Sequence, residues 1–249
     1  MDFLDKRVMV ICQELEKLKV KQRFPIPCWQ YKEGFFLTPQ EAKADAGEWS
    51  RFDSSTMHWY GPDRHCWFQT SYTVPDELDG TRMWLHACTQ IDEADHGRNP
   101  QFLLFINGEP VQGMDLNHMD VLLREQAQAG ETLDIQLQAY TGTLHSEFAL
   151  RGEMQEIDAD IEKLYYDLWV PLAAFPRMEP ESQDRLALTH VLNETVNLLD
   201  LRTPYSQEFY ASIQAASDYI SKKLYEDLAG WQEITASCIG HTHIDVAWW

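Results

Sequence analysis

The chain of 249 residues is long enough to bury a substantial core, as one large domain or two modest ones. Its composition is that of a globular protein, with 44% hydrophobic and 24% charged residues. The formal net charge of −20 argues against nucleic acid or an anionic membrane as a partner, because both would repel such a surface. A neutral ligand such as a sugar is compatible with this charge.

The N-terminal segment predicts neither secretion nor membrane insertion. It carries Asp2 and Asp5 and has no basic region ahead of an apolar stretch. No apolar run in the sequence approaches the roughly 20 residues needed to span a bilayer. The cysteines follow no framework spacing, so we expect reduced thiols packed in the core. Together these features predict a cytoplasmic protein.

The first predicted element is an amphipathic helix within residues 1–22. Its apolar stripe recurs at steps of three and four residues and consists of Leu4, Val8, Ile11, Leu15 and Leu18. The stripe is short, which favours a helix packed on its own domain over a coiled-coil dimerisation helix.

Residues 23–154 have the pattern of an antiparallel β-sandwich that resembles a jelly roll. Short segments rich in aromatic and β-branched residues recur, namely CWFQTSYTV, RMWLHACT, FLLFING and LDIQLQAY. In the last segment apolar residues occupy every second position, as on a strand with one buried face. Turn sequences separate the segments at Asp79-Gly80, Asn107-Gly108 and Ala129-Gly130.

Residues 155–230 return to the period of helices. We expect a first helix that ends at Pro171, a second helix, and a third that begins with Ser206 as its cap and ends at Gly230. The apolar stripes are Ile157, Ile161, Leu164, Tyr165 and Leu168 in the first helix, Leu188, Leu192 and Leu199 in the second, and Phe209, Ile213, Ile220, Leu224 and Leu228 in the third.

Residues 231–249 predict the start of another domain. The segment ITASCIG is short, small and largely apolar without alternation, which is typical of a strand covered on both faces in a parallel sheet or barrel. The predicted fold class is therefore mixed β and α. It comprises an N-terminal helix, an antiparallel β-sandwich, a helical connecting segment and the first strand of a truncated α/β barrel.

The segment GHTHIDVAWW follows that strand and holds the strongest candidate site. Alternate side chains of an extended backbone share a face, so His241, His243 and Asp245 project together. Ligands of α/β sheets and barrels gather beyond the C-terminal ends of the strands, where this triplet lies. Imidazole nitrogen and carboxylate oxygen both bind divalent zinc, so the pattern predicts a metal site that needs at least one further ligand.

GHTHIDVAWW resembles the opening signature of glycoside hydrolase family 38, the α-mannosidases, whose catalytic domain begins with an apolar strand ending in H-x-H-x-D followed by a tryptophan. The sandwich segments INGEPVQGMDLNHMDVLL and AGETLDIQLQAYTG resemble the non-catalytic N-terminal sandwich of the cytosolic and bacterial branch of that family. The resemblance covers nearly all of the chain, but only the beginning of a family member.

The resemblance implies a role for each matching residue. His243 and Asp245 match zinc ligands, and Trp248 matches the aromatic residue that lines the mannose subsite. His241 matches a supporting position outside the direct ligand set. The resemblance also implies a retaining mechanism with a nucleophilic aspartate and an acid/base residue whose carboxyls lie roughly 5 Å apart. Those carboxylates and the other zinc ligands would follow Trp249.

The resemblance further implies an α-mannoside glycan as substrate and Zn²⁺ as cofactor of the full-length enzyme. Neither nucleic acid nor a membrane is an expected partner, and a homo-oligomeric enzyme stays open. Because the catalytic carboxylates are expected beyond this segment, the chain alone is not expected to hydrolyse mannosides.

Two other classes of protein also remain open. The amidohydrolase superfamily places a metal-binding H-x-H at the end of its first barrel strand, but it does not require the following aspartate and tryptophan. A stand-alone sugar-binding or interaction module would use exposed indoles as stacking platforms, whereas we favour buried, structural tryptophans. The tryptophans in question are Trp29, Trp49, Trp59, Trp67 and Trp84.

Three further segments contain acids or histidines, and we expect structural roles for all of them. NHMD (117–120) and DEADHG (92–97) lie in predicted loops, and no second cluster at ligand spacing supports a metal site there. An acidic run near the first helix of the connecting segment complements the helix dipole and comprises Glu156, Asp158, Asp160 and Glu162.

Overall fold

The computed structural model describes residues 3–89, 100–143, 145 and 147–228. Two compact units divide the chain: the β unit, residues 13–162, and the helical unit, residues 1–12 together with 163–249. Within the described residues, no helix combines the length and the apolar character that a bilayer crossing requires.

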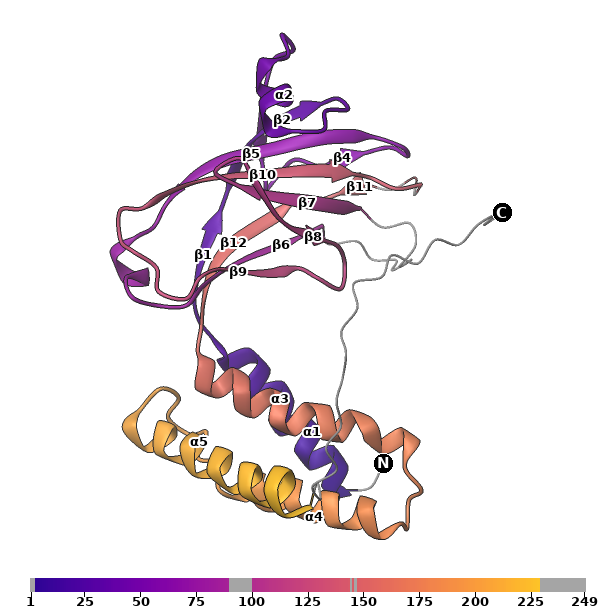
Figure 1. Ribbon diagram of the computed structural model, residues 1–249, viewed down its shortest axis with the longest axis vertical. Coiled ribbons are helices and arrows are strands. Elements are labelled where there is room, and N and C mark those ends of the chain that lie inside the picture. Colours follow the sequence, from indigo (N-terminus) through magenta and orange to yellow (C-terminus); the bar gives the residue numbers. More distant parts are fainter. Residues whose placement is uncertain (1–2, 90–99, 144, 146, 229–249) are drawn as a thin grey trace. The chain divides into compact units, whose positions relative to one another are not determined.

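Antiparallel sheets build the β unit (Figure 1). One sheet has the strand order β1 (Val20–Ile26), β12 (Arg151–Ile157), β6 (Met83–Cys88) and β9 (Asp120–Arg124). The larger sheet has the order β3 (Ser50–Asp53), β2 (Cys28–Glu33), β5 (His65–Thr73), β10 (Thr132–Tyr140), β7 (Gln101–Ile106) and β8 (Glu109–Met114). A small pair consists of β11 (Glu147–Phe148) and β4 (Trp59–Tyr60), and a single turn of helix is η1 (Asp76–Leu78). Every ladder among the described strands is antiparallel, which confirms the predicted class of sandwich.

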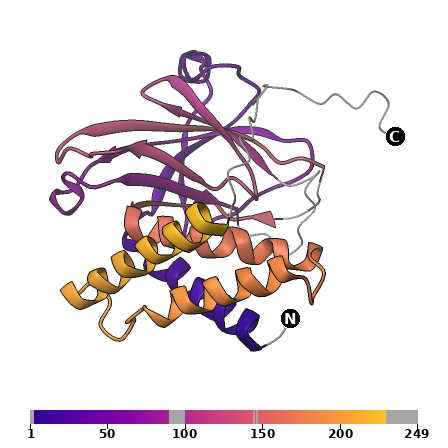
Figure 2. The same ribbon diagram turned by 60° about the horizontal axis from the view of Figure 1, so that its bottom comes forward.

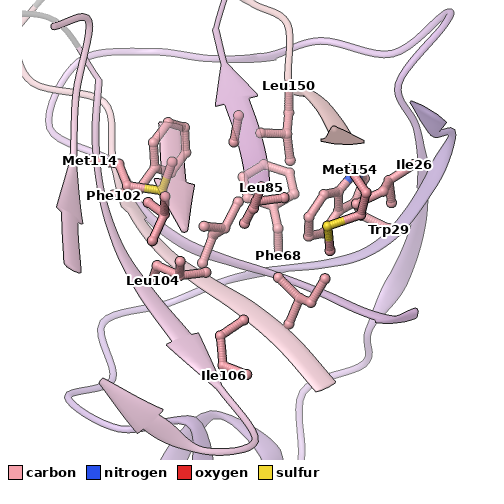
Figure 3. Packing of buried hydrophobic residues seen from close by; sticks show 14 of the residues in the cluster. Ile26, Trp29, Phe68, Leu85, Phe102, Leu104, Ile106, Met114, Leu150 and Met154 are labelled. Atoms are coloured by element: carbon pink, nitrogen blue, oxygen red, sulfur yellow. The ribbon is translucent and has the colours of Figure 1, made fainter. Parts of the chain in front are cut away.

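The inner faces of the two larger sheets share one apolar core (Figure 3). Phe68 from the six-stranded sheet belongs to the same cluster as Leu85 and Met154 from the four-stranded sheet. The predicted inward face of β10 is buried and consists of Leu133, Ile135, Leu137 and Ala139. Each large side chain buried in this way stabilises the fold by about 1.5–3 kcal/mol, so this core supplies most of the stability of the β unit.

A two-residue turn joins β7 to β8. Asn107 and Gly108 have φ values of 54° and 87°, the left-handed values that a type I′ turn requires, and Ile106 pairs with Glu109 across it. The Asn107 Oδ1 also accepts a hydrogen bond from the Asp134 N–H at 2.9 Å, which ties the turn to β10. The predicted Asn-Gly hairpin is therefore confirmed.

Residues 34–49, here called the flap, cover part of the outer face of the six-stranded sheet. The flap contains α2 (Pro39–Ala44), which begins after Thr38, whose Oγ1 accepts a hydrogen bond from the Glu41 N–H at 3.2 Å. A second apolar cluster brings flap and sheet together and comprises Ala42, Trp67 and Phe105, with Phe36, Trp49 and Leu103 packed against them. This outer face is therefore only partly solvated.

Lys32 anchors the flap to the sheet. Its side chain is 2% exposed, and its ammonium group contacts the carbonyls of Ala42 and Asp45 and the Asp45 Oδ2, each at 2.9 Å. The three protons of the ammonium group therefore all have acceptors. The same nitrogen lies 5.3 Å from the ring centroid of Phe36 and 5.6 Å from that of Trp49. Because all three acceptors of the buried Lys32 ammonium group belong to Ala42 and Asp45, these contacts hold the flap against the sheet.

The helical unit contains parts of α1 (Phe3–Leu18) and α3 (Ala159–Ala174), then η2 (Phe175–Arg177), α4 (Gln183–Asn197), α5 (Gln207–Ile220) and the π-helical segment η3 (Ser221–Leu228). Helices α4 and α5 form a hairpin (Figure 2). Ser182 and Ser206 cap these two helices, because their hydroxyl oxygens accept hydrogen bonds from the N–H groups of Arg185 and Phe209. The Ser206 cap confirms the prediction.

Helix α1 packs against the chain itself, as predicted. The side chains of Val8, Cys12 and Leu15 are at most 2% exposed. Asp5, on the same helix, is also buried and pairs with Arg185 of α4 at 2.6 Å. Of the predicted stripe, Val8 and Leu15 are buried and Leu4, Ile11 and Leu18 are partly buried, which supports the packed helix over a dimerisation helix.

The acidic run at the start of α3 has structural partners. The Asp158 Oδ1 accepts hydrogen bonds from the N–H groups of Asp160 and Ile161, both at 3.1 Å, and so caps the helix. Glu162 pairs with Arg82 at 3.0 Å. The role expected at the helix start is confirmed for Asp158, Asp160 and Glu162, whereas Glu156 lies in β12 and pairs with Lys21 at 2.9 Å.

Helix α3 corrects one expectation from the sequence, because it continues through Pro171 and ends at Ala174. A proline removes one intrahelical hydrogen bond, that to the carbonyl of Asp167. Leu172 immediately beyond it is buried, so its packing favours continuing the helix for a further turn.

The third predicted helix is also not uniform. The backbone changes from α-helix to π-helix after Ile220, and the π-helical segment runs over Ser221–Leu228. The predicted helix end at Gly230 and the predicted barrel strand within residues 231–249 lie outside the described residues.

Candidate functional site

The predicted metal and sugar site lies outside the described residues and comprises His241, His243, Asp245 and Trp248. The roles of these residues stay predictions. Within the part of the chain that the structure describes, no group of three or more His, Cys, Asp or Glu side chains is placed to hold a metal ion.

The tryptophans of the sandwich are structural, as we favoured from the sequence. Trp29, Trp59 and Trp67 are at most 3% exposed. Trp49 and Trp84 are partly buried, and Trp49 packs against the apolar cluster beneath the flap. These indoles are therefore not the exposed stacking platforms that a tryptophan-based sugar-binding module would need.

Exposed apolar side chains occur instead at the start of the flap. Phe35 is 65% exposed and Leu37 is 63% exposed. They line a groove with a volume of about 400 Å³, here called the aromatic groove. Its other lining residues are His65, Gln101, Phe102, Leu103, Gln138, Ala139 and Tyr140. The volume falls within the range of about 300–1,000 Å³ that small-ligand pockets occupy.

The register of three strands brings the polar and aromatic side chains of the groove together. Tyr140, the last residue of β10, pairs with His65 at the start of β5 and with Gln101 at the start of β7. Residues directly opposite each other on antiparallel strands lie on the same face of the sheet, about 5 Å apart. His65, Tyr140 and Gln101 therefore form one row across the sheet, on its outer face.

The rings of the groove meet at defined angles. His65 and Tyr140 stack, with ring centroids 4.7 Å apart and planes inclined by 26°. Phe35 meets His65 edge to face, with centroids 4.8 Å apart and planes inclined by 77°. An exposed ring thus stands at a steep angle to a stacked pair, which forms a corner of aromatic surface.

Hydrogen-bonding groups surround these rings. The Tyr140 hydroxyl donates to the Asp63 Oδ1 at 3.0 Å, and this bond to a carboxylate raises the pKa of Tyr140. The Gln138 side-chain amide donates to the Phe36 carbonyl at 2.6 Å and so ties the flap to β10. The exposed Gln101 side chain has no hydrogen-bond partner among the described residues. The groove therefore combines ring surface with an amide that none of the described residues engages.

Gly34 sets the path of the chain into the groove. Its φ of +151° is rarely adopted by residues with a side chain, and a Cβ atom there would lie 2.5 Å from the Phe36 Cε2. The Gly34 N–H donates to the His65 carbonyl at 2.9 Å. These constraints place Phe35 directly beside His65.

A second cluster of titratable groups lies on the four-stranded sheet. The His86 Nδ1 is 2.7 Å from the Asp120 Oδ1, joining β6 to β9. The hydrogen bond with Asp120, and then one with Cys88, raises the pKa of His86 to about 10. His86 is therefore an imidazolium at neutral pH, and its charge is balanced by the carboxylate across the ladder.

Of the two loops considered for a second metal site, the structure describes NHMD (117–120) but not DEADHG (92–97). In the NHMD segment, the His118 Nδ1 lies 2.9 Å from the Asp115 Oδ1. Burial acts to raise the pKa of Asp115, but this hydrogen bond and those from the N–H groups of Asn117 and His118 lower it overall. The expected hydrogen-bonded loop is thus confirmed there. The DEADHG segment lies outside the described residues.

The aromatic groove was not predicted from the sequence, although the segment GFFLT (34–38) carried a signal for it. Three successive apolar residues stand there between a strand and a helix start, where a loop is normally polar. An apolar run in such a loop therefore indicates exposed phenylalanine rings, which the positions of the tryptophans do not reveal.

No protein-family model matches the chain. It is 24% identical over 241 residues to alpha-mannosidase 2C1 from Mus musculus, which covers 86% of this chain and 21% of that protein. The Homo sapiens alpha-mannosidase 2C1 is 25% identical over 202 residues, covering 74% of this chain and 18% of that protein. The chain is thus distantly related to α-mannosidases, which confirms the predicted resemblance, and it spans about a fifth of the length of these relatives.

Solved structures with a partly similar backbone are also glycosidases. A β-glucuronidase from Ruminococcus gnavus, bound to C6-substituted uronic isofagomine, covers 57% of this chain and 30% of its own, with a TM-score of 0.38 and 9% identity. The Faecalibacterium prausnitzii β-glucuronidase covers 55% and 32%, with a TM-score of 0.35 and 11% identity. Similarity at this level supports no inference about function.

Proposed function

We propose that this chain forms part of a zinc-dependent, retaining α-mannosidase that hydrolyses terminal α-mannosides. The observation that carries the proposal is the sequence similarity to alpha-mannosidase 2C1 over 86% of the chain. The H-x-H-x-D-x-x-W pattern of residues 241–248 supports the same chemistry.

The donor set of that pattern fits zinc. His243 would contribute an imidazole nitrogen and Asp245 a carboxylate oxygen, both of which are common zinc ligands, and further ligands would come from other parts of the enzyme. His241 would support the site without binding the metal. When bound, zinc would act as a Lewis acid and hold sugar hydroxyls during distortion of the ring.

Trp248 would line the subsite that receives the terminal mannose. An indole ring packs on the apolar face of a pyranose and excludes water from the reacting bond. The nucleophilic aspartate and the acid/base residue would follow Trp249 in the full-length enzyme. For this reason we expect the 249-residue chain to be inactive on its own, with its described units serving binding and assembly.

The test is the activity and metal content of the full-length enzyme. We expect hydrolysis of p-nitrophenyl α-D-mannopyranoside, its loss on treatment with a chelator, and its recovery on addition of zinc. In His243→Ala and Asp245→Ala, bound zinc measured by mass spectrometry should fall together with activity. Because metal content is measured directly, the ligand assignment does not depend on catalysis.

His118→Ala is the matched control for those variants. His118 is a solvent-exposed histidine in the β unit, so its removal should leave both zinc content and hydrolysis unchanged. Full zinc occupancy in His243→Ala and Asp245→Ala would contradict the assignment. An intact mass of the endogenous protein near 29.0 kDa would contradict the full-length enzyme itself.

The proposed enzyme acts in the cytoplasm on a neutral glycan. Support for this location comes from the resemblance of the sandwich segments to the cytosolic and bacterial branch of the α-mannosidases. The net charge of −20 suits a neutral mannoside better than an anionic partner. Fractionation of source cells, with the activity followed by the same assay, checks the location.

A further inference from the structure

We propose that the aromatic groove binds the pyranose ring of a neutral glycan, and that this glycan is an α-mannoside, an identity that rests on the proposed function. The groove lies wholly within the β unit, on residues of the flap, β5, β7 and β10. The inference therefore assigns a sugar-contacting role to the sandwich itself.

Ring surface supplies the first part of the recognition. A pyranose has an apolar face of C–H groups, and an exposed aromatic ring is a partner for that face. Phe35 presents such a ring, and the His65–Tyr140 stack presents a second surface at a steep angle to it. A pyranose that enters this corner would contact ring surface on two sides.

Polar groups supply the second part. The Gln101 amide offers one acceptor and two donors, and among the described residues nothing engages them. Asp63 lies beside the groove, where its carboxylate already accepts from Tyr140 and has remaining lone pairs. An amide can donate to and accept from sugar hydroxyls, and a carboxylate can accept from them, so the two together could bind neighbouring hydroxyls.

Preorganisation supplies the third part. His65, Tyr140 and Gln101 are held by strand register, and the flap that carries Phe35 is held by the Lys32 anchor. A groove that exists before binding loses little conformational entropy when it binds its ligand. Phe35 is 65% exposed, so most of its ring surface contributes no burial to the fold and would gain burial against a sugar.

A neutral sugar suits this surface better than the alternative occupant, a segment of protein. Protein-docking patches are usually broad and apolar at their centre. Here Gln101, His65 and the Tyr140–Asp63 pair place polar groups within the groove and at its edge. The high negative charge of the chain also disfavours acidic sugars.

The experiment titrates the 249-residue chain with methyl α-D-mannopyranoside and with α-1,2-mannobiose, followed by calorimetry and by saturation-transfer NMR. We expect weak but saturable binding with transfer from aromatic protons to the sugar. Phe35→Ala should weaken binding by about tenfold, the effect of losing roughly one stacking contact. Because Phe35 is largely exposed, this variant should fold normally, which circular dichroism checks.

Tyr60→Ala is the matched control. Tyr60 is 71% exposed and aromatic, but it does not line the groove, so its removal should leave binding unchanged. Gln101→Ala should weaken binding as Phe35→Ala does, although less strongly. Equal losses in Tyr60→Ala and Phe35→Ala would overturn the proposal, because they would indicate nonspecific contact with exposed rings.

The outcomes separate this inference from the proposed function. No saturable binding of any neutral hexoside overturns the groove, while mannoside hydrolysis by the full-length enzyme would still stand. Binding of methyl α-D-glucopyranoside or methyl β-D-galactopyranoside in place of the mannosides overturns the mannose identity. Capture of a peptide at Phe35 with no sugar binding also overturns the proposal, in favour of a protein-docking surface.

Discussion

The two faces of the six-stranded sheet carry different kinds of side chain. On the inner face, the alternate side chains of β10 are all buried in one apolar cluster shared with the opposite sheet. On the outer face, β5 and β10 carry three different surfaces in turn: the aromatic groove at His65, the flap-covered cluster at Trp67 and a polar row at Gln69. The inner face thus provides stability, and the outer face provides the chemistry that can bind a ligand.

The largest expected effect concerns the inner face. Phe68 is fully buried and contacts the rings of Tyr31, Phe52 and Trp59. Phe68→Ala should lower the free energy of unfolding by about 3–5 kcal/mol, because it removes buried apolar surface and leaves a cavity. Urea denaturation followed by tryptophan fluorescence measures the loss.

Phe35→Ala is the matched comparison, since it also removes a phenylalanine side chain, here from the flap that covers part of the outer face. Phe35 is mostly exposed, so its removal should change the free energy of unfolding by less than about 0.5 kcal/mol. A loss in Phe35→Ala comparable to that in Phe68→Ala would contradict the division of roles between the two faces.

The second prediction tests the anchor of the outer face. Lys32→Ala should lower the free energy of unfolding by about 2–3 kcal/mol, because the carbonyls of Ala42 and Asp45 lose a charged donor and the flap loses its attachment. Amide hydrogen exchange should accelerate in residues 34–49 more than in β10. Lys43→Ala is the control, since Lys43 is exposed and lies 3.6 Å from Asp134, a pair worth about 0.5 kcal/mol or less. Unchanged exchange in the flap would show that the anchor is not needed.

The inner face of β10 was predictable from the sequence, because its apolar residues alternate from Leu133 to Ala139. Two features outside that face, the Asn107-Gly108 turn and the Ser206 cap, were predictable for a similar reason, since each depends on residues only a few positions apart. Burial of one face, a left-handed turn and a capped helix each require particular residue types at fixed spacing. These features are therefore recovered without knowledge of the tertiary structure.

The outer face was not predictable, because it depends on contacts between distant residues. Lys32 reads as a solvated charge on a strand, and only the fold brings Asp45 and the Ala42 carbonyl to it. The groove similarly needs the register that sets His65 beside Tyr140. Helix α3 passes Pro171 for a related reason, since the burial of Leu172 is a tertiary effect. The predicted metal site stays a prediction, because its residues lie outside those that the structure describes.

The third prediction concerns the outer face of the four-stranded sheet and depends on pH. The pKa of His86 is about 10 in the folded chain, against about 6.5 in the unfolded chain. Protonated His86 therefore stabilises the fold fully below about pH 6.5, and this contribution declines with rising pH and is lost above about pH 10. Asp120→Asn should cost about 1 kcal/mol at pH 6, because the pair is partly exposed to solvent, and almost nothing above pH 10.

Two measurements check that prediction. The pKa of His86 should be read directly by NMR titration of its ring protons, and it should fall toward 6.5 in Asp120→Asn. The free energy of unfolding should be compared between the two proteins from pH 6 to pH 10. A difference that grows with pH would reverse the expected sign and show that His86 folds in its neutral form.

The smallest expected effect tests the polar end of the outer face. Gln30, Gln69 and Gln136 stand opposite one another on β2, β5 and β10. Gln136 is 2% exposed, and its Oε1 has no hydrogen-bond partner among the described residues. Burying a polar atom without a partner costs free energy, so Gln136→Leu should be neutral or should stabilise the fold by up to about 1 kcal/mol.

Gln69→Leu is the control for that substitution, because Gln69 occupies the neighbouring position in the row but is only partly buried. Its replacement should change the free energy of unfolding by less than about 0.5 kcal/mol. Destabilisation of Gln136→Leu by more than about 1 kcal/mol would mean that its amide is satisfied in solution by an ordered water or a bound small molecule. The outer face would then carry a second ligand-contacting position beside the flap, in the pocket that Gln136 lines with Lys43 and Asp134.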